Sequence, residues 1–440
     1  MSKYFGTDGI RGAYGSALMN ESFAQKVGQA IGAFLKTHCP DDPTVAIASD
    51  TRPSGPSLKQ ALIEGLCGMG VKMIDFGVAP TPALSFGVLK HNASFGVMIT
   101  ASHNPFGDNG IKCFTDKGTK LRIEQELEIE HWIDQSHPVS QRQEAPIHDS
   151  IHQEYLNNLQ KYFCQLDLTG IKIALDTANG ATCKTTQSML ENLGATVFGI
   201  HQGNGMINEG CGSEHLDSLK KLVHQKNADV GIAHDGDGDR VRFVDADGKV
   251  IDGDQILGLL ALHAHRNQQL ESSTFVATVH SNSGLFAFLN NHAIHGKASD
   301  VGDRNVYLKM LEEKSNWGGE SSGHIICTDY LPTGDGLFAA LSVLKVMQEQ
   351  SKPLSSLAHD IKLWPSLSGS FQVSEKIPID RIPELTERIS METSLLKEEG
   401  RILLRYSGTE PKIRLLVEGK SIEKITPSYQ RLQVAIEKSL

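Results

Sequence analysis

The chain has 440 residues, of which 21% are charged and 39% hydrophobic, and its formal net charge is −10. This length predicts roughly three or four domains. The acidic balance, without a run of Lys and Arg, argues against nucleic-acid binding, and no apolar run is long enough to cross a membrane. Seven scattered cysteines with no Cys-x-x-Cys pair indicate reduced thiols rather than a disulfide framework or a zinc site. We therefore expect a soluble cytoplasmic enzyme or binding protein.

The first motif along the chain is a glycine-rich turn, 6–12, that holds Arg11. The planar fork of an arginine can grip a phosphate, but a surface arginine in a glycine loop is the simpler interpretation, and the local sequence favours it. A strand over 44–50, a polar Pro/Gly turn, a helix over 58–66 and a strand over 71–77 are predicted next. This order is typical of a strand–helix–strand unit in a parallel sheet.

A buried strand predicted over 95–99 ends in a hydroxyl-rich turn, 100–112, that is closed by Asn-Pro and Asn-Gly. Ser102 thus lies at a strand exit, where functional residues of sheet proteins are often found. A turn residue or helix cap is the alternative. A hydrolase nucleophile is disfavoured, because no Gly-x-Ser-x-Gly elbow surrounds Ser102 and the adjacent His103 is not how a base is normally presented to serine. The polar stretch 135–146 is interpreted as a linker.

The strand–turn–helix pattern recurs twice more without a repeated sequence, which predicts three α/β domains of related layout with mixed sheets. A smaller C-terminal α+β domain is expected to follow. We predict domains over 1–150, 151–253, 254–365 and 366–440. The elements behind this prediction are strand 171–176, a helix to 193 and strand 195–198; strand 274–279 and a helix to about 289; then 369–373, helix 382–389, strands 401–405 and 413–418, and a final helix.

A further strand of the second domain, 229–233, runs directly into a loop in which three carboxylates alternate with two glycines. Carboxylates this crowded repel each other unless a cation lies between them, and the glycines let the backbone bend. A few hard oxygen ligands favour Mg²⁺. An EF-hand does not fit, because its sixth and twelfth positions are Arg240 and Ala246, so a solvated acidic turn is the remaining alternative. The candidate metal ligands are Asp235, Asp237 and Asp239.

The segment 317–324 places hydrogen-bonding side chains in a flexible turn. Glu320 and Ser322 suit the paired hydroxyls of a sugar, and His324 could move a proton near neutral pH. A plain hairpin turn explains the same residues equally well.

A last polar loop separates two predicted C-terminal strands. Hydroxyls, backbone N–H groups and flanking arginines can together form an anion-binding nest. We favour phosphate binding over a plain hairpin. The candidate residues are Arg405, Ser407, Gly408, Thr409 and Arg414.

Four of these motifs occur together and in order, one in each predicted domain. They are Thr-Ala-Ser-His-Asn-Pro around Ser102, Asp-Gly-Asp-Gly-Asp-Arg over 235–240, Gly-Glu-Ser-Ser-Gly-His over 319–324 and Arg-Tyr-Ser-Gly-Thr-Glu-Pro over 405–411. With them the chain resembles the α-D-phosphohexomutase family along essentially its whole length. The resemblance implies four domains around a central cleft.

The resemblance also implies a reaction and the residues that carry it. Phosphorylated Ser102 would donate its phosphoryl group to a hexose monophosphate, and the other phosphate of the resulting bisphosphate would return to Ser102. One Mg²⁺ would be bound by the three aspartates and a Ser102 phosphate oxygen. Lys112 or His324 would be the general acid/base, and nearby arginines would lower the pKa of Lys112. The implied catalytic residues are Ser102, Lys112, His324, Arg11 and His103; Arg240, Glu320 and Ser322 would bind the sugar, and Arg405, Ser407, Gly408, Thr409 and Arg414 the phosphate that is not reacting.

The opening Gly-Thr-Asp-Gly-Ile-Arg-Gly resembles family members that act on glucosamine phosphates. This implies a hexosamine phosphate substrate, a sugar bisphosphate such as glucosamine 1,6-bisphosphate as activator, and a product used for UDP-N-acetylglucosamine. Ser321, in the segment expected to bind the sugar, and Tyr406, in the segment expected to bind phosphate, are less usual for the family. They therefore bear on which substrate is preferred and not on the class of reaction. A monomer or homodimer is expected, with no nucleic-acid or membrane partner. The alternatives are a phosphomannomutase/phosphoglucomutase, a phosphatase, or a non-catalytic phosphosugar-binding regulator.

Overall fold

The computed structural model describes residues 2–39, 41–136, 145–406 and 411–439. Contacts within the chain divide it into two units: Met1–His280 with Ile294–His359, and Ser281–Ala293 with Asp360–Leu440. Most of the predicted linker over 135–146 lies outside the described residues. None of the described helices is long and apolar enough to cross a membrane.

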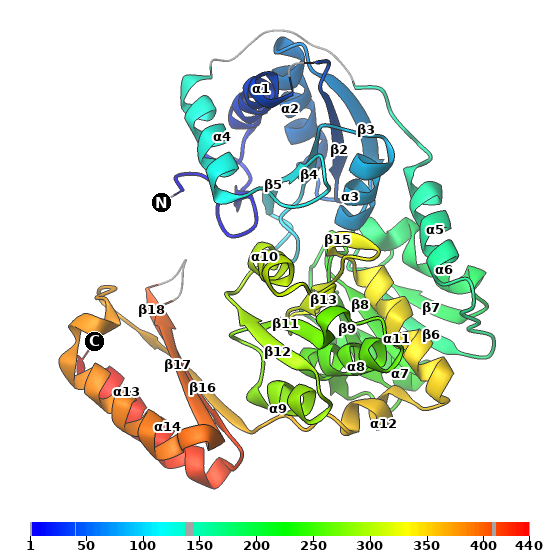
Figure 1. Cartoon of the computed structure of the whole chain (residues 1–440). Coiled ribbons are helices and arrows are strands. Elements are labelled where there is room, and N and C mark those ends of the chain that lie inside the picture. Colours follow the sequence, from blue (N-terminus) through cyan, green and yellow to red (C-terminus); the bar gives the residue numbers. More distant parts are fainter. Residues whose placement is uncertain (1, 40, 137–144, 407–410, 440) are drawn as a thin grey trace. The chain divides into compact units, whose positions relative to one another are not determined.

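The first unit contains three five-stranded sheets (Figure 1). The first sheet consists of β1 (Ile10–Ala13), β2 (Thr44–Ser49), β3 (Lys72–Val78), β4 (Phe95–Ile99) and β5 (Asp108–Thr115). The second consists of β6 (Lys172–Asp176), β7 (Thr196–Ile200), β8 (Val230–His234), β9 (Val241–Asp245) and β10 (Val250–Ile251). The third consists of β11 (Thr274–Thr278), β12 (His295–Ser299), β13 (Trp317–Gly319), β14 (Ile325–Cys327) and β15 (Leu331–Gly334).

All three sheets have the same arrangement, which confirms the predicted related layout. Their strand orders are β3-β2-β4-β5-β1, β7-β6-β8-β9-β10 and β12-β11-β13-β14-β15. The first three strands of each order are parallel, and the last two pair antiparallel. The parallel strands β2, β4, β8 and β11 are almost wholly buried, as expected for strands covered on both faces.

Two sequence predictions in the first sheet need correction. Arg11 lies on strand β1, which pairs with β5, and not in a tight turn. The Asn109-Gly110 pair likewise lies within β5 and does not close the serine loop, because the Asn109 side chain donates to Ser54 and Gly110 pairs with Arg11. Both departures arise from pairing between segments about 100 positions apart, which local turn signals do not reveal.

Helices of the first unit flank these sheets (Figure 1). Helix α1 packs on α2 and α4, and α3 contacts β2, β4 and α5. Side-chain caps help to start several helices: Asn20 accepts from the N–H of Phe23, and Asp335 from that of Phe338. The helices are α1 (Glu21–His38), α2 (Gly55–Gly68), α3 (Thr81–Lys90), α4 (Ile123–Gln135), α5 (Ile151–Tyr162), α6 (Thr186–Asn192), α7 (Asp217–Lys226), α8 (Gly253–Arg266), α10 (Asp303–Glu313), α11 (Gly336–Gln350) and α12 (Leu354–His359).

The second unit is built on an antiparallel sheet in the order β16-β18-β17. Helices α13 and α14 pack against each other and against this sheet (Figure 1). Helix α9 belongs to this unit, since the N–H of Ser283 donates to the Glu418 carboxylate at 2.6 Å. The elements are α9 (Ser283–Asn291), β16 (Ser366–Gln372), α13 (Pro383–Leu396), β17 (Gly400–Tyr406), β18 (Lys412–Gly419) and α14 (Ile422–Ser439). The fold class predicted from the sequence, three related α/β domains and a smaller C-terminal α+β domain, is confirmed.

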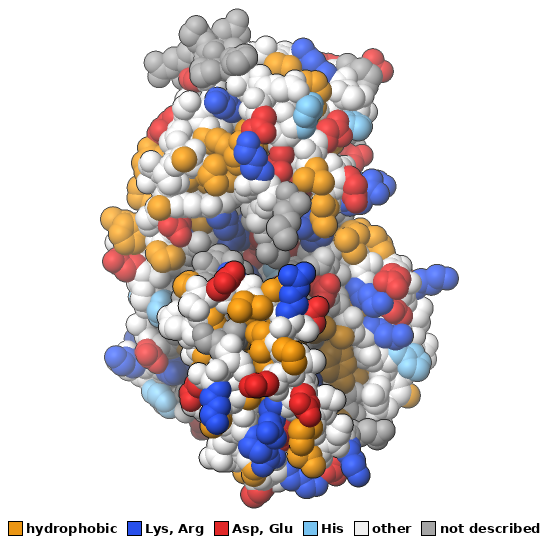
Figure 2. Space-filling view, turned by 90° about the vertical axis from the view of Figure 1, so that its left-hand side faces the viewer, with side chains coloured by type: hydrophobic (Ala, Val, Ile, Leu, Met, Phe, Trp, Pro, Cys, Tyr) orange, Lys and Arg blue, Asp and Glu red, His pale blue; other side chains and the backbone are white. Residues whose placement is uncertain are grey.

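Charged side chains of both signs are interspersed on the face drawn in Figure 2. Among its described residues, Lys and Arg side chains lie beside Asp and Glu side chains, with small hydrophobic groups between them. This face therefore presents no extended field of one sign.

Candidate active site

Ser102 follows strand β4 with a strained backbone. Its φ is +53°, in the left-handed region that costs a residue with a Cβ about 1–2 kcal/mol. The residue is buried, and its N–H donates to Thr100 Oγ1 at 2.9 Å. Its carbonyl accepts hydrogen bonds from Arg52 at 2.9 Å and Asn208 at 2.7 Å. Strain held by so many contacts is typical of functional loops.

Arg52 fixes the whole serine loop. Its side chain is fully buried and pairs with Asp50 at 3.0 Å. The guanidinium fork then donates to four backbone oxygens of the loop, which the three N–H donors of a single lysine ammonium could not satisfy together. Arg52 lies in the segment predicted as a Pro/Gly turn and was assigned no role from the sequence. Its position at the exit of a strand, β2, was the one feature of the sequence that could have indicated a functional residue. The accepting carbonyls are those of Ser102, Asn104, Pro105 and Asp108, at 2.5–2.9 Å.

Replacing Arg52 with lysine is expected to lower the free energy of unfolding by about 2–4 kcal/mol, because several buried carbonyls lose their donors. The kcat for any reaction at Ser102 is expected to fall more than KM changes, since the loop loses its shape. Urea unfolding and steady-state kinetics measure both effects. The exposed Arg266 is the control: Arg266→Lys should change stability by less than about 0.5 kcal/mol. Equal behaviour of the two variants would refute a positioning role for Arg52.

The acidic loop follows strand β8 and packs closely against the serine loop. Gly238 has a φ of +73°, and a Cβ added to Gly236 would lie 2.7 Å from the carbonyl oxygen of Ser102. Glycine is therefore required at Gly236 for the two loops to meet, and at Gly238 for the backbone conformation. One oxygen from each aspartate lies within 4.8 Å of the others, and all three residues are buried. The structure thus gathers the carboxylates of Asp235, Asp237 and Asp239.

The hydroxyl of Ser102 meets this trio directly. Ser102 Oγ donates to Asp235 Oδ2 at 2.6 Å, and His103 Nδ1 lies 3.2 Å from the same Oγ. Burial, with the charge of Arg240 second, lowers the pKa of His103 to about 4, which favours a neutral ring. The predicted nucleophile and the predicted metal ligands are therefore brought together.

The charge of the trio is only partly compensated. Burial, together with the charges of Asp239 and Asp237, holds the pKa of Asp235 well above its usual range. Among the described residues, Asp237 Oδ1 and Asp239 Oδ1 are buried without a hydrogen-bond partner. Buried carboxylate oxygens without donors are costly, and a divalent cation bound between them would satisfy them. The trio therefore fits a hard cation with oxygen ligands.

Lys112, on β5, inserts its ammonium among carboxylates. Its Nζ lies 2.7 Å from Asp237, 3.1 Å from Asp239 and 3.0 Å from Asp8. Burial alone lowers the pKa of Lys112, but these three carboxylates outweigh it and hold the pKa well above its usual range. Arg11 lowers this pKa, as expected of a neighbouring arginine, but the three carboxylates outweigh Arg11 as well as burial.

The third sheet contributes Glu320, Ser322 and His324 through the hairpin turn between β13 and β14. The plain-hairpin interpretation is therefore correct as a description of the backbone. This turn lies against the acidic loop, because Arg240 bridges to His324. The Glu320 carboxylate accepts from the N–H of Gly302 at 3.0 Å. The hydroxyl of Ser322 is buried and has no hydrogen-bond partner among the described residues.

His324 lies between two carboxylates, 3.7 Å from Asp239 and 3.7 Å from Asp303. Burial lowers its pKa, but Asp239, Asp303 and Glu320 together raise it to about 9. The N–H of Gly334 points at its Nε2 from 3.1 Å and favours the neutral ring. The carboxylates therefore favour the protonated ring, and the Gly334 N–H opposes them.

Several residues around this centre were not singled out from the sequence. The hydroxyl of Thr81 donates to Asp237 at 2.6 Å. Asp8 pairs with Arg11, Lys112 and Lys120, and its place in the glycine-rich N-terminal motif was an available signal. Thr81, at the start of α3, gave no local signal.

In the second unit, Arg405 and Arg414 face each other across β17 and β18. Burial, together with the charge of Arg414, lowers the pKa of Arg405. Like charges directly opposite on a sheet are unfavourable, so an anion here would stabilise the pair. Ser407, Gly408 and Thr409 lie outside the described residues.

Four family models match the chain in succession. They are described as phosphoglucomutase/phosphomannomutase alpha/beta/alpha domains I, II and III and the C-terminal domain, and they match residues 2–139, 153–248, 252–363 and 371–427. The chain belongs to the phosphoglucomutase/phosphomannomutase family. The resemblance to the α-D-phosphohexomutases is therefore confirmed, and the chain is a sugar-phosphate mutase of this family by descent.

Relatives within the phosphoglucomutase/phosphomannomutase family match the full length. A phosphoglucosamine mutase of Syntrophotalea carbinolica is 40% identical over 447 residues, covering 100% of this chain and 98% of the relative. One of Oceanobacillus iheyensis is 39% identical over 448 residues, covering 100% of both.

Solved structures share the fold at lower identity. A phosphoglucomutase/phosphomannomutase family protein from Burkholderia thailandensis superposes with a TM-score of 0.83 at 22% identity, covering 100% of this chain and 98% of that one. An N-acetylphosphoglucosamine mutase from Aspergillus fumigatus gives 0.69 at 16%, covering 100% and 96%. At these identities the likeness concerns the fold alone.

Proposed function

We propose that this chain interconverts glucosamine 6-phosphate and glucosamine 1-phosphate through a phosphorylated Ser102. The observation that carries the chemistry is the contact between Ser102 Oγ and the Asp235 carboxylate, inside a buried trio of aspartates. The substrate is inferred from full-length relatives at about 40% identity that are named phosphoglucosamine mutases.

In the forward direction, a hydroxyl of the sugar phosphate attacks the phosphorus on Ser102. The bond from phosphorus to Ser102 Oγ breaks as the bond to the sugar oxygen forms, and the hydroxyl proton passes to a basic group. The resulting 1,6-bisphosphate presents its other phosphate to Ser102 Oγ, and the reverse transfer leaves the isomer. We assign the proton transfers to Lys112 or His324 and keep His103 as a further candidate beside Ser102.

The three aspartates would bind one Mg²⁺, with a phosphate oxygen on Ser102 as a further ligand. When bound, the ion offsets negative charge on the phosphoryl group in transfer. We propose that a sugar bisphosphate, such as glucosamine 1,6-bisphosphate, supplies the phosphate that first loads Ser102.

The remaining predicted residues would orient the substrate. Glu320 and Ser322 are proposed to bind ring hydroxyls, and the unpaired Ser322 hydroxyl suits that role. Arg11 and Arg240 would bind phosphoryl oxygens near Ser102. Arg405 and Arg414, with Ser407, Gly408 and Thr409, are proposed to bind a phosphate group of the substrate.

We also propose that the product supplies UDP-N-acetylglucosamine synthesis in the cytoplasm, and that the enzyme works as a monomer or homodimer. The domain boundaries near residues 150, 253 and 365 stay predictions.

A substrate panel tests the proposed specificity. Coupled assays would compare glucosamine 6-phosphate, glucose 6-phosphate and mannose 6-phosphate, each with and without sugar bisphosphate. We expect kcat/KM to be at least about tenfold higher for glucosamine 6-phosphate, a difference of about 1.4 kcal/mol in transition-state stabilisation. A preference for a neutral sugar would instead assign a phosphomannomutase or phosphoglucomutase. Steady release of inorganic phosphate would indicate a phosphatase, and no turnover of any sugar would indicate a binding protein.

A further inference from the structure

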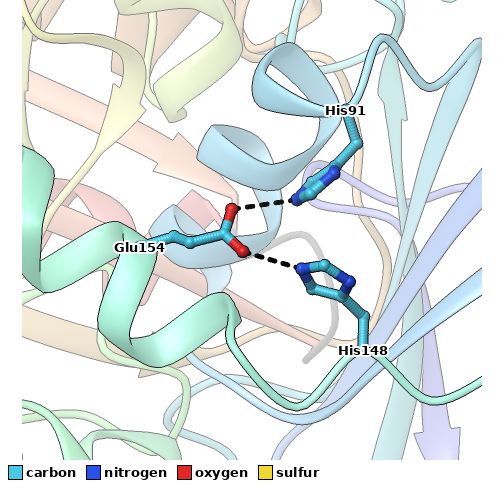
Figure 3. A group of neighbouring side chains, drawn as sticks. All are labelled: His91, His148 and Glu154. Carbon is cyan, nitrogen blue, oxygen red and sulfur yellow. Dashed lines mark hydrogen bonds and ion pairs between the residues drawn. The ribbon is translucent and has the colours of Figure 1, made fainter.

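A second cluster of metal-ligating side chains lies away from this centre and consists of His91, His148 and Glu154 (Figure 3). His91 caps the end of α3, and Glu154 lies in the first turn of α5. The Nε2 atoms of His91 and His148 lie 3.1 and 2.8 Å from the two oxygens of the Glu154 carboxylate. One ligand atom from each residue lies within 4.8 Å of the others. Both rings thus direct a ring nitrogen at one carboxylate.

The geometry of this cluster is held by its surroundings. The two imidazole rings make an edge contact with centroids 4.4 Å apart, and both lie against Phe76 at 5.7 and 5.8 Å. Ser150 Oγ donates to the Glu154 carboxylate at 2.5 Å. The three ligand side chains are 21%, 31% and 24% exposed, so an ion could reach them from solvent. The cluster is therefore both ordered and accessible.

We propose that His91, His148 and Glu154 bind a Zn²⁺ ion. Two histidines and one carboxylate are a known ligand set of zinc sites that keep a fourth position for water. Zinc–ligand bonds of about 2.0–2.2 Å in a tetrahedron place ligand atoms about 3.3–3.6 Å apart, so the 3.1 Å contact of His91 would need to open by about 0.2–0.5 Å and the 2.8 Å contact of His148 by about 0.5–0.8 Å.

The ligand type separates this site from the aspartate trio. Imidazole nitrogens favour zinc and other transition metals, whereas an all-carboxylate set favours Mg²⁺. The two sites are also connected through one helix: α3 begins at Thr81, whose hydroxyl donates to Asp237, and it is capped at its other end by His91. Zinc would thus join α5 to the far end of the helix that contacts the aspartate loop.

The full chain, freed of metal with a chelator and kept in excess Mg²⁺ to occupy the aspartates, provides the test. Co²⁺ is the probe, because it replaces zinc in tetrahedral sites and then absorbs visible light far more strongly than when bound by six oxygens. The variants are His148→Ala and the near-isosteric Glu154→Gln. His38→Ala is the matched control, since His38 also lies 2.9 Å from a glutamate, Glu128, but belongs to no group of three metal-ligating side chains among the described residues.

We expect the unmodified chain to bind one equivalent of Co²⁺ with strong visible absorption that Zn²⁺ abolishes. The dissociation constant should rise at least about tenfold in His148→Ala and Glu154→Gln and stay unchanged in His38→Ala. Mutase activity in Mg²⁺ and circular dichroism should be unchanged in all three variants, which shows that they are folded. No strong absorption in the unmodified chain, or equal Co²⁺ affinity in a folded Glu154→Gln, would overturn the zinc site and leave a hydrogen-bonded His–Glu–His group.

Discussion

Replacing Ser102 with alanine is expected to lower mutase kcat by about 10⁴-fold or more, a loss of roughly 5.4 kcal/mol of transition-state stabilisation. The reason is that the proposed mechanism has no other covalent carrier for the phosphoryl group, and alanine removes the hydroxyl that donates to Asp235 at 2.6 Å. Steady-state assays with and without added bisphosphate measure the effect. Intact-mass spectrometry should find one phosphate on part of the purified wild-type protein and no phosphate on the Ser102→Ala variant.

Ser102→Gly is the companion variant, because it separates the effect of losing the hydroxyl from the effect of a change in stability. At a φ of +53°, glycine escapes the strain that serine and alanine share, so Ser102→Gly should be more stable than Ser102→Ala by up to about 1–2 kcal/mol. Both variants should nevertheless be equally inactive. Substantial turnover in either folded variant would contradict the phosphoserine mechanism.

Replacing Asp237 with asparagine is expected to lower kcat by about 10²–10⁴-fold and to raise the Mg²⁺ concentration needed for half-maximal rate. Asparagine keeps the size of the side chain but removes a charge from the proposed cation site, and it weakens the ion pair that Lys112 makes at 2.7 Å. Losses of this order are typical when electrostatic stabilisation of the transition state is removed. Titration of the rate with Mg²⁺ measures both effects.

Asp247, exposed in the turn between β9 and β10, provides the control for this variant. Asp247→Asn also removes one negative charge from the second domain, but it leaves the aspartate trio unchanged, so its metal dependence should match the wild type. An identical Mg²⁺ response in Asp237→Asn and the wild type would show that Asp237 does not bind the metal ion.

Much of the architecture could be predicted because its core strands are buried on both faces. The apolar run 95–99 coincides with β4, and the strands predicted over 171–176 and 274–279 match β6 and β11 to within one residue. The acidic loop could be placed because it directly follows such a strand. The candidate site loops thus lie at strand ends, where functional residues of sheet folds are often found.

Contacts between distant segments could not be predicted in the same way. Arg52 reaches the serine loop 50 positions away, and Thr81 reaches Asp237 across 156 positions. Thr81 has no local signature, and the position of Arg52 after a strand does not reveal which carbonyls it binds. The pKa of Lys112 depends on which charges surround it in space: Arg11 lowers it, as expected, but the sequence did not reveal the three carboxylates that raise it overall. The segment that forms strand β1 was interpreted as a turn because it is rich in glycine. It is a strand because it pairs with β5.

The central claim is that every turnover passes a phosphoryl group through Ser102, and radiolabelled phosphoenzyme tests it most directly. Protein carrying labelled phosphate on Ser102 would be mixed with unlabelled glucosamine 6-phosphate and Mg²⁺ and quenched at intervals shorter than one turnover. We expect the label to leave the protein and to appear first in sugar bisphosphate and then in sugar monophosphate. The rate constant of this loss should be at least as large as kcat. Product formation while the label stays on Ser102 would contradict the central claim.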